Sequence, residues 1–375
     1  MKIGLLTYYG DLNCGTNLQA YACLLALRNS FPKDDVEIIP IHGFVPPGVH
    51  PYFSYFTIKS LFNDFIRIKK YSYFIKNNLE VKEDIVEKNL TQALSFIEKR
   101  SYDMIFVGSD TILELDRISD DSSLSLYWLS PQIKSKKILL AASSKNVNYE
   151  GLSENQKSQM KLSLNDFIGF GVRDENTFDL VASFIPKEKL ELIPDPTFSL
   201  EIDDRITDEY LKKKQILIPQ KSLLFHTTKS DNKWAATAAK EYRGQGYKIY
   251  SLRPAPWADE VLNDMSPLEQ LGIYRYFECV ITHRFHDAVF CLKNMTPMLL
   301  YTPHGFSSTN GVKSKFTHLL DMFGLLQSNY METPQDEIFL KMGKSISSFN
   351  VRRDKIATQL NDCSKLFYNY ISQFK

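Results

Sequence analysis

A chain of 375 residues is too long for one ordinary domain, and its hydrophobic and charged fractions, 43% and 24%, are those of a soluble globular protein. A formal net charge of +1 gives no sign of nucleic-acid binding. No apolar run approaches the roughly 18 residues that span a bilayer, and the apolar part of the N-terminal MKIGLLTYYGDLNCG is too short for a signal peptide.

The cysteines indicate a reducing compartment. They are odd in number and show no paired spacing, which does not fit a disulfide framework. The chain also contains no C-x-x-C or H-E-x-x-H motif, so we expect no metal site. We therefore expect a cytoplasmic protein of two domains. The five cysteines are Cys14, Cys23, Cys279, Cys291 and Cys363.

The first part of the chain repeats the order strand, loop, helix. The helix after the first strand, LQAYACLLALRNSF, carries Leu18, Ala22 and Leu25 on one face. This repeated order favours a parallel sheet with helices on both faces. The strands that we predict here are 2–9, 35–41, 102–110, 136–144, 168–175 and 190–200.

The charged stretch 201–220 holds the predicted boundary, after which the same pattern starts again. We expect a first domain over 1–205, a second over 206–350, and a helix over 351–375 that crosses back to the first. Ligands bind at the carboxyl ends of parallel strands, so the cleft between two such sheets is the expected site. The second set of predicted strands is 221–228, 247–254, 278–284 and 297–303.

Polar residues between the first strand and its helix form the first candidate. The free N–H groups and positive end of a helix favour an anion or a polar ligand. The alternative is a helix cap with a turn glycine. The candidate residues of this acceptor or anion loop are Asn13, Gly15, Thr16 and Asn17.

Asp110 and Arg173 each follow a predicted strand. A carboxylate in that place can accept a proton from a hydroxyl, whereas its alternative role is to cap a helix. A guanidinium matches the geometry of carboxylate or phosphate, whereas its alternative is an ion pair with Asp174 or Glu175.

The fourth candidate is THRFH, where an apolar run from Cys279 to Ile281 gives way to a helix. Strand alternation would place Arg284 and His286 on one side and His283 and Phe285 on the other. An arginine and an imidazole together can hold an anion and deliver a proton to it.

Aromatic and basic residues interleave over 51–76, PYFSYFTIKSLFNDFIRIKKYSYFIK. Such a segment suits an anionic membrane surface near a lipid-linked acceptor, or stacking on sugar rings. The alternative is an ordinary helix packed on the first domain.

The chain resembles the polysaccharide pyruvyl transferase family. The similar segments are collinear: KIGLLTYYGDLNCGTNLQAYACLLAL, DMIFVGSD, FIGFGVRDENTFDLV, LELIPDPTFSL and the long block from SPLEQ to Tyr301. Two departures stand out, since Asp287 lies where glycine is common in the family and Leu113 replaces a tryptophan.

The resemblance implies two Rossmann-like α/β domains with a central cleft, in a GT-B-like arrangement. It also implies transfer of pyruvate from phosphoenolpyruvate to two hydroxyls of a sugar in exopolysaccharide biosynthesis, forming a cyclic ketal and releasing phosphate. The family residues that serve phosphoenolpyruvate correspond to Asp110, Arg173, Arg284 and His286.

In this scheme His286 is the general acid and Asp110 the general base. Arg173 and Arg284 bind the two anionic groups of the donor, with Lys313 and Lys315 as further phosphate contacts. No cofactor is expected beyond phosphoenolpyruvate as co-substrate.

The expected partners are phosphoenolpyruvate and a sugar or lipid-linked oligosaccharide, and the expected place is the cytoplasm, at the inner face of the membrane if 51–76 makes that contact. Two other functions are weighed: a GT-B glycosyltransferase with a nucleotide-sugar donor, and a non-catalytic sugar-binding subunit of a polysaccharide assembly complex.

Overall fold

The computed structural model describes residues 1–41, 58–82, 90–115, 124–145, 147–302, 315–332 and 338–375. The chain divides into two compact units that are discontinuous in sequence. Unit 1 comprises Met1–Val49, Ser72–Leu200 and Cys363–Lys375, and unit 2 comprises His50–Tyr71 and Glu201–Asp362.

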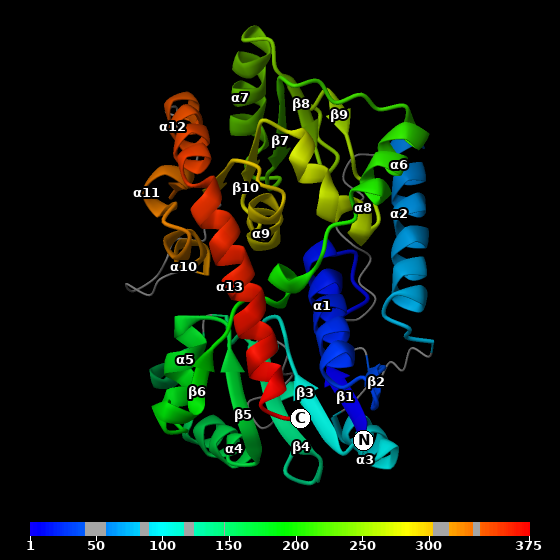
Figure 1. Cartoon of the computed structure of the whole chain (residues 1–375), viewed down its shortest axis with the longest axis vertical. Helices are drawn as coiled ribbons and strands as arrows, with labels where there is room; N and C mark the ends of the chain where they lie inside the picture. Colours follow the sequence, from blue (N-terminus) through cyan, green and yellow to red (C-terminus); the bar gives the residue numbers. More distant parts are fainter. Residues whose placement is uncertain (42–57, 83–89, 116–123, 146, 303–314, 333–337) are drawn as a thin grey trace. The chain divides into compact units, whose positions relative to one another are not determined.

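Unit 1 is built on a six-stranded parallel sheet of order β2-β1-β3-β4-β5-β6 (Figure 1). Its central strands carry the buried apolar runs MIFV in β3 and ILLAA in β4, as expected of parallel strands that are covered on both faces. The strands are β1 (Lys2–Leu6), β2 (Asp35–Ile38), β3 (Met104–Val107), β4 (Lys136–Ala142), β5 (Phe167–Val172) and β6 (Leu190–Leu192).

Helices connect these strands in the order that parallel pairing requires. A capping box starts one of them, since the Ser153 hydroxyl accepts from the Gln156 N–H and the Gln156 side chain accepts in return. The helices are α1 (Cys14–Ser30), α3 (Leu90–Arg100), α4 (Glu154–Leu164) and α5 (Glu175–Ala182), with short 3-10 turns η1 (Leu126–Trp128), η2 (Tyr149–Gly151), η3 (Lys187–Lys189) and η4 (Pro196–Ser199).

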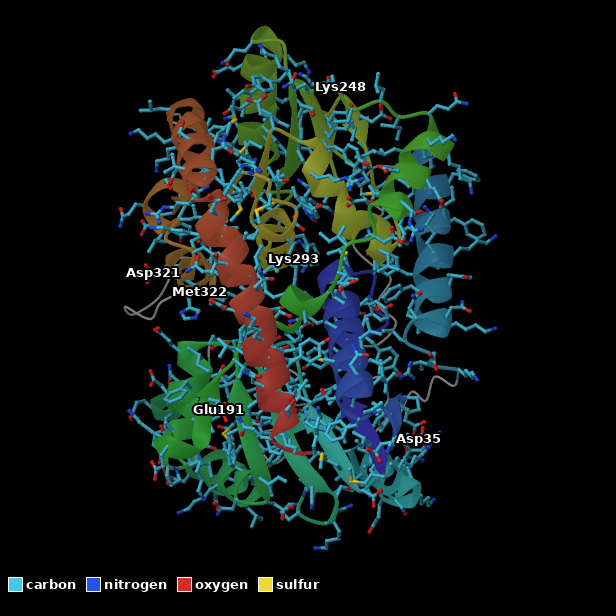
Figure 2. The ribbon with its side chains drawn as sticks, viewed as in Figure 1. Asp35, Glu191, Lys248, Lys293, Asp321 and Met322 are labelled. Atoms are coloured by element: carbon cyan, nitrogen blue, oxygen red, sulfur yellow. The ribbon has the colours of Figure 1, made fainter. Side chains whose placement is uncertain are left out.

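The last residues of the chain pack on the sheet of unit 1. The Tyr370 hydroxyl of α13 (Arg353–Ser372) donates to the Leu139 carbonyl at 2.8 Å. A Cβ at Gly171 would lie 2.7 Å from the Tyr370 ring, so this close approach requires glycine. Beyond the helix, Gln373 donates to Glu191 of β6, labelled in Figure 2, at 2.9 Å.

Unit 2 is built on a second six-stranded parallel sheet, of order β12-β11-β10-β7-β8-β9 (Figure 1). Its register places Thr282 of β10 beside His226 of β7, each the last residue of its strand. The strands are β7 (Ser222–His226), β8 (Lys248–Ser251), β9 (Glu260–Val261), β10 (Cys279–Thr282), β11 (Met298–Tyr301) and β12 (Tyr330–Met331).

The charged stretch 201–220 contains a helix of unit 2, not only a boundary. Its buried residues, Thr207, Tyr210 and Leu211, share one face of an otherwise polar helix. The helices that lie wholly in unit 2 are α6 (Asp204–Lys214), α7 (Asn232–Gly244), α8 (Pro267–Gly272), η5 (Ile273–Tyr276), α9 (Phe285–Lys293), α10 (Lys315–Met322), α11 (Leu326–Asn329) and α12 (Ile338–Val351).

Helix α2 (Ile58–Asn77) begins in unit 2 and ends in unit 1. Within unit 2, Lys70 of α2 pairs with Glu269 at 2.6 Å and Asn63 donates to Asn263 at 2.9 Å. Among the described helices, α2 included, none has the length and apolar character needed to cross a membrane.

Candidate functional site

The carboxyl edge of the first sheet brings Asp110 and Thr16 together. Asp110 lies three residues beyond β3, and its carboxylate accepts from the Thr16 hydroxyl of α1 at 3.0 Å and from the Thr111 N–H at 2.8 Å. Its φ of 78° is in the left-handed region, which is uncommon outside glycine. The described residues that follow are not α-helical, so Asp110 does not cap an α-helix there.

Arg173 follows β5 directly and is buried with a carboxylate that the sequence did not single out. Its guanidinium donates to Asp195 at 2.8 Å and lies 4.0 Å from Asp110. Burial opposes the charge of Arg173, but the carboxylates of Asp195 and Asp110 outweigh it and raise the pKa of the guanidinium. The predicted partner Asp174 instead caps α5 by accepting from Thr177.

Asp195 completes a buried group of side chains in unit 1. It accepts from the Gln19 amide at 2.7 Å and from the Thr197 N–H at 2.9 Å, in addition to Arg173. We call Thr16, Gln19, Asp110, Arg173 and Asp195 the Asp110 cluster. The cluster therefore combines side chains from α1 with side chains from the loops that follow β3, β5 and β6. These side chains surround Asp110 at the carboxyl edge of the sheet.

The loop ahead of α1 shows the contacts of a helix cap. The Asn13 side chain accepts from the Gly15 N–H at 3.1 Å. Asn17 is fully buried, donates to the carbonyls of Asp11 and Asn13, and accepts from the Gly10 N–H. These contacts shape the loop, and its predicted role in binding an anion stays a prediction.

In unit 2 the expected strand alternation through THRFH is wrong. β10 ends at Thr282 and α9 begins at Phe285, so only His283 and Arg284 lie between strand and helix. Arg284 is the N-cap residue of α9, and its N–H donates to the Thr282 hydroxyl at 2.9 Å. His286 lies in the first helical turn, and both side chains are half-buried.

A buried carboxylate organises this strand end. Asp287, only 3% exposed, accepts from the Tyr274 hydroxyl at 2.7 Å and the Thr282 hydroxyl at 2.8 Å. Its carboxylate also lies 2.6 Å from Nδ1 of His226. We call Asp287, His226, Tyr274 and Thr282 the Asp287 hub. The sequence marked Asp287 as a departure from the family pattern, and these contacts give it a structural role.

Burial and charge set the protonation states around the hub. Burial raises the pKa of Asp287, but His226 and the donated hydrogen bonds outweigh that effect and hold the pKa well below its usual range. Burial lowers the pKa of His226 despite the opposing effect of Asp287. Burial likewise lowers the pKa of His283 to about 4. At neutral pH the carboxylate is therefore ionised and both imidazoles are neutral.

Arg253 and Lys315 are two further cationic residues of unit 2 that bear on the candidate site. Arg253, two residues beyond β8, is buried and donates to Thr227 at 3.2 Å and Asn232 at 2.9 Å. Lys315 begins α10 with its ammonium 5.6 Å from the centre of the Phe285 ring. Lys315 therefore contacts the residue between Arg284 and His286, whereas Lys313 lies outside the described residues.

A family model described as polysaccharide pyruvyl transferase matches residues 13–305. This match spans most of the chain and contains the Asp110 cluster, the Asp287 hub, Arg284 and His286. The chain belongs to the polysaccharide pyruvyl transferase family. The resemblance found in the sequence is thereby confirmed. No curated protein sequence matches the chain.

Solved structures share the fold of this pyruvyl transferase family member at low sequence identity. UDP-GlcNAc 2-epimerase from Neisseria meningitidis, solved with UDP-GlcNAc bound, has 12% identity and a TM-score of 0.53, with 100% of this chain and 98% of that one covered. The enzyme from Methanocaldococcus jannaschii has 12% identity and a TM-score of 0.55, with 92% of each chain covered. Together with the two parallel sheets, these matches confirm the predicted GT-B-like fold class of two Rossmann-like domains.

Sequence reasoning missed His226, Arg253 and Asp195. Each lies at or just after the carboxyl end of a parallel strand, as the predicted residues do. That position was the available signal, because the segments LLFHTT, YSLRP and LIPDP were all recognised as strand ends. Their partners were not predictable, since Asp287 lies 61 residues from His226 in the chain.

Proposed function

We propose that this polysaccharide pyruvyl transferase moves pyruvate from phosphoenolpyruvate onto two hydroxyls of a sugar, forming a cyclic ketal and releasing phosphate. The observation that carries the proposal is the meeting of Arg284, His286 and the N-terminal end of α9 at one strand end. Guanidinium, imidazole and helix N–H groups are the donors that a small molecule with a carboxylate and a phosphate requires.

The residues of unit 2 that are proposed to bind phosphoenolpyruvate have different roles, which follow from their chemistry. Arg284 is always charged and is proposed to hold one anionic group of the donor in a bidentate manner. Lys315, which contacts the Phe285 ring, is proposed as a further phosphate contact. His286 is proposed as the general acid, because an imidazolium can donate a proton to a reacting carbon.

The Asp110 cluster in unit 1 is proposed to serve the acceptor. Asp110 is partly exposed, whereas Arg173 and Asp195 behind it are buried. The Asp110 carboxylate, which accepts from Thr16 and lies 4.0 Å from the Arg173 guanidinium, is proposed to take a hydroxyl proton. Arg173 stays a proposed second arginine for the donor, and its contacts with Asp195 and Asp110 also give it the role of orienting the base.

The proposed reaction proceeds in two additions. Asp110 takes the proton of the first hydroxyl while that oxygen bonds to C2 of the donor, and His286 gives a proton to the methylene carbon. The C–O bond to phosphate then breaks, and the second hydroxyl attacks C2 with loss of its proton. The second proton leaves with the phosphate, and exchange with solvent deprotonates Asp110 and reprotonates His286 before the next turnover. The products are the methyl-bearing ketal and phosphate, so atoms and charge balance.

Phosphate release tests this proposal. The chain is incubated with phosphoenolpyruvate and a panel of methyl hexosides, and inorganic phosphate and ketal are measured together. We expect phosphate to appear only when an acceptor with two suitable hydroxyls is present. Equal release without any sugar would indicate a phosphatase and contradict the proposal.

The nucleotide-sugar alternative finds less support in unit 2. Asp287 was the carboxylate considered for a ribose, and it is buried with three hydrogen-bonding partners of its own. A carboxylate so occupied is poorly placed to accept from ribose hydroxyls.

We also propose that α2 rests on an anionic membrane surface, where a lipid-linked acceptor would lie. Phe62 and Phe65 are 62% and 53% exposed, and the Lys69 ammonium lies 4.3 Å from the centre of the Phe65 ring. Exposed aromatic rings interleaved with lysine are typical of helices that bind at a lipid interface. Residues 51–57 of the predicted segment lie outside the described residues.

Flotation with vesicles containing phosphatidylglycerol tests the membrane contact. The variant F62S/F65S should lose binding, and K69Q should weaken it, whereas wild-type chain should float. Lys161→Gln, which replaces an exposed lysine of unit 1, is the matched control. Unchanged flotation of F62S/F65S would contradict the contact, as would flotation with neutral vesicles alone.

The cytoplasm is proposed as the place of action. All five cysteines are free and buried, which fits a reducing compartment.

A further inference from the structure

The reaction proposed above leaves the acceptor of its second hydroxyl proton unassigned. Two hydroxyls lose their protons, and Asp110 still carries the first of these when the second hydroxyl attacks. The methylene carbon takes up one proton, and the other must reach the departing phosphate through some group. The structure holds an unassigned imidazole at the same strand ends as Arg284, namely His226 at the end of β7.

Geometry fixes the position of the proton on His226. Its Nδ1 lies 2.6 Å from the Asp287 carboxylate, which also accepts from Tyr274 and Thr282. An ionised carboxylate only accepts hydrogen bonds, so Nδ1 must carry the proton. A neutral imidazole with its proton on Nδ1 has its lone pair on Nε2, and this nitrogen can therefore accept a proton.

Burial is the main reason that His226 is neutral at pH 7. Burial lowers the pKa of the imidazole, Arg284 and Arg253 lower it further, and Asp287 opposes them. The neighbouring His283 ring, 5.7 Å away between centroids, is neutral as well. A neutral imidazole has a lone pair that can accept a proton, and the contact of His226 with Asp287 stabilises the imidazolium that forms.

We infer that His226 is the second proton acceptor of the transfer, with Asp287 as the positioning residue that sets its tautomer; this inference rests on the proposed function. In the step concerned, the O–H bond of the second hydroxyl breaks as its oxygen bonds to C2, and the proton goes to Nε2 of His226. The imidazolium then gives that proton to the departing phosphate. The same pair explains why an aspartate occupies position 287 of this chain.

His283 provides a matched control. Its Nδ1 donates to the His226 carbonyl at 2.8 Å, so it has the same protonated nitrogen with a carbonyl as the acceptor where His226 has a carboxylate. With a pKa of about 4 it is a weak base. Asparagine is the matched substitution at both positions, because its amide nitrogen can replace Nδ1 as the donor while offering no basic lone pair.

Nitrogen-15 NMR of the full chain tests the tautomer without any need for activity. With histidines labelled and the His226 signals assigned by H226N, we expect a neutral ring protonated at Nδ1 at pH 7. In D287N the amide can donate to the ring, and we expect the proton to move to Nε2. A wild-type His226 that is protonated at Nε2, or doubly protonated at pH 7, would overturn the inference.

Steady-state kinetics test the role of His226 as a proton acceptor. With phosphoenolpyruvate and the best methyl hexoside, H226N should lower kcat on the order of 100-fold while the Kd for phosphoenolpyruvate stays within about twofold. D287N should also lower kcat although the imidazole remains, and H283N should change it by less than about threefold. Equal effects of H226N and H283N would assign His226 a structural role only.

The two possible failures are distinguishable. If wild-type chain binds phosphoenolpyruvate and releases phosphate while H226N keeps its kcat, the inference is wrong and the proposed function stands. If wild-type chain neither binds phosphoenolpyruvate nor releases phosphate from it, the proposed function is wrong, and the catalytic role of His226 is wrong with it.

Discussion

His286 lies in the first turn of α9, beside a residue whose ring contacts Lys315. Its own ring stacks on Phe290, one turn further along the helix, at 6.1 Å between centroids. This contact orients the imidazole through apolar packing against the Phe290 ring. A group held in this way suits a general acid, because orientation is set before the donor binds.

At this scale we predict that His286→Ala lowers turnover on the order of 100-fold, because the methylene carbon loses its proton donor. Binding of phosphoenolpyruvate should persist, since Arg284 remains. Phosphate release and calorimetry measure the two effects separately. Lys293→Ala, at the other end of α9 and labelled in Figure 2, is the control and should behave as wild type. Normal turnover in His286→Ala would remove His286 from the mechanism.

A second prediction at the residue scale concerns the buried ion pair of unit 1. Asp195→Ala should lower the free energy of unfolding by about 3–5 kcal/mol, because Arg173 would stay buried without its main carboxylate. Chemical denaturation of the full chain measures the change. Lys157→Ala removes an exposed pair with Glu154 and should leave stability unchanged. A loss at Asp195 no larger than that of the control would mean that the pair stabilises little.

The elements that meet at the Asp287 hub are β7, β10, η5 and α9. Asp287 contacts a residue from each of the other three elements. The Thr282 hydroxyl links it to Arg284, because this hydroxyl donates to Asp287 and accepts from the Arg284 N–H. The hub therefore positions the link between β10 and α9 that carries the proposed donor groups. The stability of the chain should depend on pH, because His226 of the hub and the neighbouring His283 are both held neutral by burial.

We predict that the chain loses stability as the pH falls from about 6.5 toward 4. The pKa of His283 is about 4 in the folded state and near 6.5 in the unfolded state, so the unfolded state takes up the proton first. The lowered pKa of His226 acts in the same direction. Below about pH 4, protonation of Asp287 in the unfolded state removes further stability.

Thermal unfolding at pH 7 and pH 5 measures this effect. H283N should lose less in melting temperature between the two pH values than wild-type chain does. Lys293→Ala should follow wild type. A drop in melting temperature that is identical in wild type and H283N would show that His283 does not carry the pH dependence.

The sequence predicted most elements but not how their ends meet. The parallel strands, the crossing helices and the residues Asp110, Arg173, Arg284 and His286 followed from apolar runs that end in polar residues. The alternation through THRFH failed because β10 ends two residues before the arginine. His226 was not predictable as a partner, since only the register of β7 against β10 brings it to Asp287.

At the scale of the whole molecule, each unit has its own sheet and its own hydrophobic core. The division of the chain is discontinuous, because residues 363–375 belong to unit 1 although they follow unit 2. The proposed donor groups of α9 lie in unit 2, and the proposed base lies in unit 1. Phosphoenolpyruvate should therefore protect backbone amides of unit 2 more than those of unit 1.

We predict that phosphoenolpyruvate slows amide hydrogen exchange over 279–293 in unit 2, where Arg284 and His286 lie. Exchange in α4 of unit 1 should not change, and α4 is the internal control. Arg284→Gln should abolish the protection at the same donor concentration. Protection confined to unit 1 would place the donor elsewhere and contradict the assignment.

The central claim is that the site takes phosphoenolpyruvate, and a calorimetric titration tests it most directly. Phosphoenolpyruvate and UDP-GlcNAc are titrated separately into the wild-type chain and into Arg284→Gln. The account predicts that phosphoenolpyruvate binds the wild-type chain, that Arg284→Gln weakens this binding at least about tenfold, and that UDP-GlcNAc neither binds nor competes. Binding of UDP-GlcNAc without binding of phosphoenolpyruvate would contradict it.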